Sequence, residues 1–168
     1  MHRPLQRLLL GVWILSLSAC GFALRGGDVI SSQFSSIQLI SQQPNSEFSR
    51  LLRRSLDVSD VAVELVESIE PVASQALLSI GDERVVSSPV TVNPRARAAQ
   101  YEMRLSVEIA LGRGDQILIE PETLFVERTY FEDIENISGN REEVEIIAAE
   151  MRRELVNQLM RRLQAAGG

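Results

Sequence analysis

The sequence predicts a single α+β domain, in which a mainly antiparallel sheet of about four strands carries two helices on one face. Residues 101–111 place six apolar side chains at a strict period of two, the pattern of a strand with one buried face. Residues 48–56 and 144–163 place apolar side chains three and four positions apart, which predicts two amphipathic helices. Because each element has one apolar face, the economical packing puts both helices against the same side of the sheet.

The first 19 residues have the composition of a secretory signal. Arg3 and Arg7 precede an apolar segment, residues 8–17, and small residues follow it. That segment is too short to cross a bilayer as a helix, which needs about 20 apolar residues. We therefore expect residues 1–19 to be removed on export.

The junction after this signal contains the only cysteine. Residues 17–20, Leu-Ser-Ala-Cys, resemble the lipobox of bacterial lipoproteins, in which the signal is cut before the cysteine and the cysteine is acylated. A single cysteine cannot form an internal disulfide, and lipidation of Cys20 accounts for the lone thiol. The resemblance implies attachment to a membrane through several N-terminal acyl chains, because one chain alone binds only marginally. Gly21, rather than an aspartate, follows the cysteine, which in lipoproteins favours the outer membrane.

The composition excludes several classes of function. Removing residues 1–19 takes away two of the 17 basic residues and none of the 23 acidic ones, so the net charge of −6 becomes −8. This acid excess argues against nucleic acid as a partner. The only histidine, His2, lies in the signal, so the mature chain has no imidazole for triad catalysis or for the usual zinc sites. The acidic runs lack EF-hand spacing and are typical of solvated faces, so we predict neither a metal nor a cofactor.

Two glycines, Gly26 and Gly27, and a serine-rich stretch follow the cysteine. This composition predicts that residues 20–35 form the lipidated N-terminus and a flexible tether, with order beginning near Ser36. Residues 36–168 are long enough to bury a core around one domain without a metal or a disulfide.

The first helix is expected between two short strands. Residues 37–39 alternate in polarity, and so do residues 61–65, which predicts a strand at each place. Between them, Asn45 is a suitable N-cap for the helix that carries the apolar residues of 48–56.

The remaining elements are three longer β segments and a C-terminal helix. Gly81 and Pro89 predict bulges or an edge position within the first β segment. Asn140, with an acid three residues later, resembles a capping box at the start of the last helix. The β segments are residues 76–92, 101–111 and 117–131, with turns at 93–97 and 112–115.

Residues 20–26, Cys-Gly-Phe-Ala-Leu-Arg-Gly, resemble the opening of the outer-membrane lipopolysaccharide-assembly lipoproteins, the LptE family. That opening is Cys-Gly-aromatic-x-Leu-Arg, in which the x is often histidine and is Ala23 here. Residues 99–103, Ala-Gln-Tyr-Glu-Met, also resemble a segment of the family, and the order of elements matches over nearly the whole mature chain. The resemblance implies a non-enzymatic lipoprotein that assists lipopolysaccharide transport and sits as a plug inside a large β-barrel translocon of the LptD family.

The same resemblance implies a candidate ligand site. Arg95 and Arg97 occupy the turn between two β segments, and Arg141 lies near the start of the last helix. Family members tend to carry basic residues at both places, where charge-assisted bonds to the phosphates of lipid A could form. The alternative for the turn is a solubilising role.

Two other functions stay open. A periplasmic lipoprotein adaptor of another envelope transport system would carry the same anchor. Glu120 and Glu122 lie two apart, which allows a carboxylate-based hydrolase of cell-wall glycan, although paired catalytic carboxylates also need a cleft and a raised pKa. Pro121 between them is explained more simply as a strand break.

Overall fold

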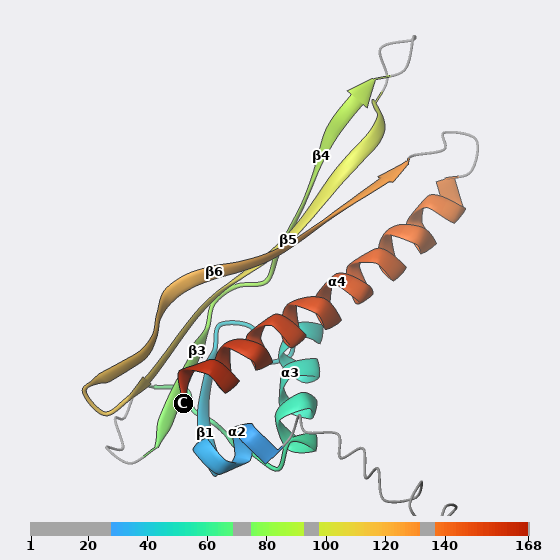
Figure 1. The fold of residues 1–168 in the computed structure, drawn as a ribbon. Coiled ribbons are helices and arrows are strands. Elements are labelled where there is room, and N and C mark those ends of the chain that lie inside the picture. Colours follow the sequence, from blue (N-terminus) through green and yellow to red (C-terminus); the bar gives the residue numbers. More distant parts are fainter. Residues whose placement is uncertain (1–27, 69–74, 93–97, 132–136, 168) are drawn as a thin grey trace, which may run out of the picture.

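The fold comes from a computed structural model, which describes residues 28–68, 75–92, 98–131 and 137–167. Within these ranges the chain forms six strands and three helices (Figure 1). They are α2 (Asp28–Gln33), β1 (Ser36–Ser41), α3 (Glu47–Val58), β2 (Ala62–Leu65), β3 (Ala76–Ile80), β4 (Arg84–Val92), β5 (Ala98–Arg113), β6 (Gln116–Phe131) and α4 (Ile137–Ala166).

The sheet is built around β5. On one side of β5, β3 pairs with residues 109–113 and β4 pairs with residues 98–106, so β3 and β4 follow one another along the same edge. β6 pairs antiparallel with the other edge of β5 over nearly its full length. Beyond β3 the sheet continues through β1 to β2, which gives the order β2-β1-β3-β5-β4 with β6 beside β5.

The expected sheet of about four mainly antiparallel strands with two helices is wrong. The structure has a mixed sheet of six strands, because β1 runs parallel to both β2 and β3, and three helices occur among the described residues. Parallel neighbours need a crossover connection, and α3 supplies it between β1 and β2. Alternation of polarity marks a strand but carries no information about the direction of its neighbour.

The alternating segment of β5 forms the centre of the core, as predicted. Met103, Leu105, Val107, Ile109 and Leu111 are all buried. The side chains between them point to the opposite face, which in the neighbourhood of β4 and β6 faces solvent. We call this second face, turned away from α4, the open face.

The predicted β region of residues 76–92 is interrupted at residues 81–83, which separate β3 from β4. At the break, the amide of Gly81 donates to the carbonyl of Glu108 at 2.8 Å, and a Cβ at position 81 would lie 3.1 Å from the Cβ of Glu108. Glycine therefore allows this close approach. Pro89 lies in an edge strand next to a register shift, as its sequence predicted.

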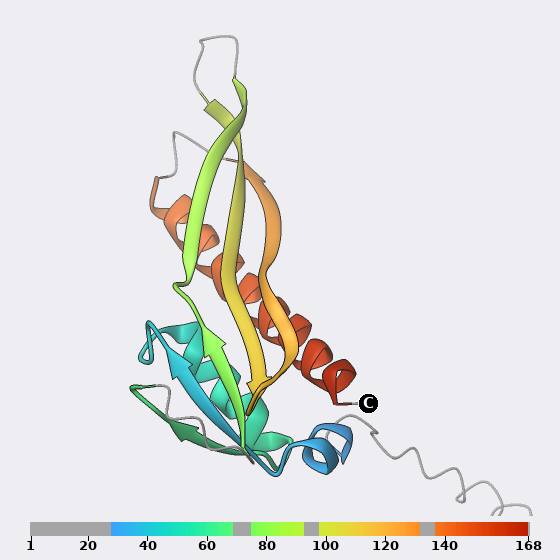
Figure 2. The ribbon, with the colours of Figure 1, turned by 90° about the vertical axis from the view of Figure 1, so that its left-hand side faces the viewer.

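α3 and α4 cover the inner face of the sheet, and α4 runs along it beside β5 and β6 (Figures 1 and 2). α4 has 30 residues and is therefore about 45 Å long. Both expected caps are displaced: Ser46 caps α3, accepting a hydrogen bond from the amide of Ser49 at 3.1 Å, and Asn140 lies inside α4. None of the described helices has the length and apolar character needed to cross a membrane.

The first described helix corrects the expected tether. Residues 28–33 form α2, and Ile30 and Phe34 are almost fully buried in the core, so order begins well before Ser36. Arg113 fixes this helix to β5: its Nη2 donates to the carbonyl of Gln33 at 3.1 Å, and its guanidinium lies 5.1 Å from the ring centre of Phe34. Two apolar side chains in a serine-rich stretch were too weak a pattern to predict this packing.

Candidate functional site

One end of the sheet projects beyond α2 and α3 (Figures 1 and 2). We call this projection the arm; it consists of β4, residues 98–106 of β5 and residues 125–131 of β6. At its inner face, the rings of Tyr101 and Tyr130 stack with their centres 5.5 Å apart. The arm is thus a three-stranded sheet with α4 along one face and an open face on the other.

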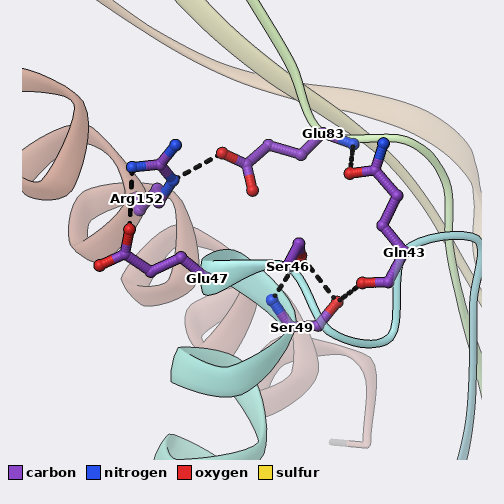
Figure 3. A network of polar contacts seen from close by, with 6 residues as sticks. All are labelled: Gln43, Ser46, Glu47, Ser49, Glu83 and Arg152. Carbon is purple, nitrogen blue, oxygen red and sulfur yellow. Dashed lines mark hydrogen bonds and ion pairs between the residues drawn. The ribbon is translucent and has the colours of Figure 1, made fainter. Parts of the chain in front are cut away.

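The base of the arm is joined to both long helices by a polar network (Figure 3). Nε of Arg152 donates to Oε1 of Glu83 at 2.5 Å, and Nη1 of Arg152 donates to Oε2 of Glu47 at 3.1 Å. The amide of Glu83 donates in turn to Oε1 of Gln43 at 3.3 Å. Since Glu83 lies in the break between β3 and β4, these bonds hold the arm at a defined angle to the helices.

The open face of the arm presents aromatic and charged side chains to solvent. The guanidinium of Arg104 lies 4.7 Å from the ring centre of Phe125 and also forms an ion pair with Glu127. Phe125 is 48% exposed and Phe131 68% exposed. Exposed aromatic rings beside an arginine are the composition of contact surfaces rather than of ordinary solvated faces.

The predicted ligand residues are only partly described by the structure. Arg95 and Arg97 fall in residues 93–97, outside the described part of the chain, and Cys20 also lies outside it. Arg141 is exposed in the second turn of α4. Figure 1 shows that the end of β4, the start of β5 and the start of α4 all lie at the same end of the molecule. The strand ends that border the arginine turn and the helix that carries Arg141 therefore share one end of the fold.

The carboxylates considered for hydrolysis are not arranged as a catalytic pair. Oε1 of Glu122 forms an ion pair with Nε of Arg162 at 3.3 Å, whereas Glu120 is exposed. A register shift separates the two positions, because Ile109 is paired with Glu122 and Leu111 with Ile119. Among the described residues, no group of three or more acidic, cysteine or histidine side chains could hold a metal ion.

A feature that sequence reasoning missed lies at the other end of the open face. A cavity of about 240 Å³ opens between β1, β3, β5 and the start of β6. No sequence pattern predicted this cavity, because its walls depend on the register shift in β6. It is lined by Gln38, Gln75, Leu77, Ser79, Ala110, Leu111, Gly112, Gly114, Ile117, Ile119 and Pro121.

Small bacterial lipoproteins of known structure share this fold, a mixed sheet with one long helix. Rare lipoprotein B from Shewanella oneidensis superimposes with a TM-score of 0.68 at 20% identity, over 77% of this chain and 94% of that chain. An uncharacterized lipoprotein B from Nitrosomonas europaea gives a TM-score of 0.64 at 20% identity, over 86% of this chain and 91% of that chain. At these identities the likeness establishes the fold.

The chain belongs to the LptE family, described as lipopolysaccharide-assembly, whose family model matches residues 34–163. The LPS-assembly lipoprotein LptE of Pectobacterium atrosepticum is 29% identical over the whole of this chain and 89% of its own length. The family assignment made from the sequence is therefore confirmed. The family consists of non-enzymatic lipoproteins of the cell envelope, so the expectations of a lipoprotein and of a protein without enzymatic activity are also confirmed.

Proposed function

We propose that this chain is an outer-membrane lipoprotein that assists the transport and assembly of lipopolysaccharide at the cell surface. The observation that carries the proposal is the family match, which spans residues 34–163 and so includes β1 to β6 and nearly all of α4. A relative over the full length of the chain bears the name LPS-assembly lipoprotein, which supports the same role.

The proposed partner is a large β-barrel translocon of the LptD family, inside which the domain acts as plug and assembly partner. A barrel of many strands has a wide polar lumen that a compact domain can fill. The open face of the arm suits such a wall, because Arg104 and Glu127 offer charged contacts while Phe125 and Phe131 offer large apolar ones. The bonds of Arg152 to Glu83 and Glu47 support this role, since a fixed arm enters a lumen without a loss of conformational freedom.

The proposed lipopolysaccharide contacts are Arg95, Arg97 and Arg141. Guanidinium groups form bidentate, charge-assisted bonds with phosphate, and lipid A carries phosphates. Arg141 is exposed at the end of the molecule where β4 ends and β5 begins, which supports a shared contact zone with the turn between those strands.

The proposed anchor is Cys20, acylated after removal of residues 1–19 and held in the outer membrane from the periplasmic side. Asp28 is the first described residue and lies eight positions after Cys20, a reach of about 28 Å for a fully extended chain. The folded domain would therefore stay close to the bilayer surface.

Depletion and complementation in the source bacterium test the proposal. Depleting the chain should reduce the lipopolysaccharide that reaches the cell surface and reduce the folded barrel partner, and a tagged copy should restore both. The tagged protein, purified from detergent-solubilised outer membranes, should bring down a large β-barrel protein and lipopolysaccharide. Recovery of a different envelope transport complex, with normal surface lipopolysaccharide after depletion, would instead identify the adaptor function.

A further inference from the structure

The apolar cavity on the open face is formed by a local irregularity of the sheet. β6 has an extra residue between the positions that pair with Ile109 and Leu111, and its first residues, including Ile117 and Pro121, form one wall of the cavity. At Gly112 the backbones of β5 and β6 lie close together, because a Cβ at this position would be 3.3 Å from the carbonyl oxygen of Gln116.

The opposite wall comes from β3. Leu78 and Ile80 point into the core, so Leu77 and Ser79 point to the open face, where Ser79 is paired with Ala110. The cavity is thus a hollow in the helix-free side of the sheet and does not belong to the core.

The lining sets the chemistry of an occupant. None of the residues that line the cavity carries a charge, and Leu77, Ala110, Ile117 and Pro121 supply much of its wall. Ile117 is 67% exposed, so an apolar guest would cover surface that now contacts water. At about 240 Å³ the cavity is smaller than pockets that hold drug-sized ligands, which favours a single slender group.

We propose that this cavity binds one acyl chain of an envelope lipid. The position of the anchor supports a lipid as the source. Nη2 of Arg113 donates to the carbonyl of Gln33 at the end of α2, and Arg113 lies between Gly112 and Gly114 of the cavity wall. Cys20 lies eight positions before Asp28, the first residue of α2, so acyl chains on Cys20 would lie within about 28 Å of this helix.

This inference rests on the lipidation of Cys20 within the proposed function. It adds a lipid site that is separate from the arginine turn. Arg141 and the strand ends that border the arginine turn lie where α4 begins, whereas the cavity lies where β5 ends. Lipopolysaccharide and phospholipid both carry acyl chains. The test distinguishes these two lipids by the mass of the adduct.

Photo-crosslinking in living cells tests the site on the full-length chain. The photoreactive amino acid p-benzoylphenylalanine is placed at position 117 on the cavity rim and, as a control, at position 86, where Val86 is 56% exposed on the open face of β4. After irradiation, the protein is purified and its adducts are weighed by mass spectrometry. We expect a lipid adduct from position 117 and at least tenfold less from position 86.

A substitution that fills the cavity provides the second test. Ser79→Phe introduces a ring from an exposed position on the wall, so the core should be unaffected, and its far-ultraviolet circular dichroism and urea midpoint verify the fold. The matched control is Ser88→Phe, which adds the same ring to an exposed position on the open face of β4. Ser79→Phe should reduce the lipid adduct at position 117 at least tenfold, whereas Ser88→Phe should leave it unchanged.

The outcomes separate this site from the proposed function. An adduct with the mass of lipopolysaccharide or of a phospholipid supports the acyl site. Equal adducts at positions 117 and 86, adducts of protein instead of lipid, or an adduct that persists in a folded Ser79→Phe variant would overturn it. Normal complementation with no lipid adduct would reject the cavity site and leave the proposed function standing. Failed complementation with a lipid adduct would reject the proposed function and leave the cavity site standing.

Discussion

Arg152 in the middle of α4 is bonded to Glu83, which lies 69 positions earlier in the break between β3 and β4. The side chain of Glu83 is only 8% exposed and that of Arg152 19% exposed, so this ion pair is largely shielded from water. The same guanidinium reaches Glu47 in the first turn of α3. A single side chain therefore joins the base of the arm to both long helices, as Figure 3 shows.

Arg152→Met should lower the free energy of unfolding by about 1.5–3 kcal/mol, because it keeps most of the apolar stem and leaves a buried carboxylate without its donor. The matched control is Arg128→Met, which removes the ion pair to Glu154. In that pair the side chain of Arg128 is 49% exposed and that of Glu154 41% exposed. Such an exposed pair contributes about 0–1 kcal/mol. Urea denaturation of both variants measures the difference. Equal losses would mean that the Glu83 pair is no stronger than a surface pair.

Leu105→Ala should lower the free energy of unfolding by about 2–5 kcal/mol, since Leu105 is fully buried at the centre of β5. Arg104 and Glu108 of the same strand face away from the core, and replacing either with alanine should cost less than about 1 kcal/mol. Chemical denaturation of the three variants is the measurement. A greater loss from either charged residue would contradict the assignment of the two faces.

Ile30→Ala should destabilise the domain by about 2–5 kcal/mol, because the Ile30 side chain in α2 is fully buried in the core. Ser35→Ala, at an exposed position just after the helix, should change stability by no more than about 0.5 kcal/mol. Thermal or urea unfolding distinguishes the two. If Ile30→Ala behaved like Ser35→Ala, residues 28–33 would be the tether that the sequence predicted.

Replacing Arg95 and Arg97 together with serine should weaken binding of purified lipopolysaccharide at least tenfold, since each lost charge-assisted bond is worth about 1.5–3 kcal/mol. Glutamate at both positions should weaken it further through repulsion of the phosphates. Arg141→Ser tests the third contact. The control is the double substitution Arg161→Ser and Arg162→Ser near the other end of α4, which removes as many charges as the Arg95 and Arg97 pair.

Titration of each variant with labelled lipopolysaccharide gives the affinities, and co-purification reports the barrel complex. Unchanged binding in the Arg95 and Arg97 variants would identify the turn as a solubilising element. Loss of the barrel complex together with lipid binding would place the turn in the protein interface.

Cys20→Ser should leave a domain that still folds but is soluble or retains its signal, because the serine hydroxyl does not replace the thiol in lipoprotein processing. The domain should keep its stability, since the buried core side chains of the described residues all lie between Ile30 and Leu163. Membrane fractionation and intact mass measure the outcome. Normal acylation and outer-membrane fractionation of this variant would reject Cys20 as the anchor.

Local patterns were sufficient for much of the fold. The alternation over residues 101–111 predicted the buried face of β5, and the spacing of apolar residues predicted α3 and α4, because both periods follow directly from backbone geometry. Residues 20–26 and 99–103 were sufficient for the family, which the match over residues 34–163 confirms.

What the sequence determined by itself was thus each strongly periodic element and the family of the chain. Only the tertiary structure decided the parallel pairing of β1, the packing of Ile30, the Arg152 network and the cavity beside Ile117. Each of these depends on residues far apart in the chain that meet only when the strands and helices pack together. Their free energy comes from contacts across elements, which no local period encodes.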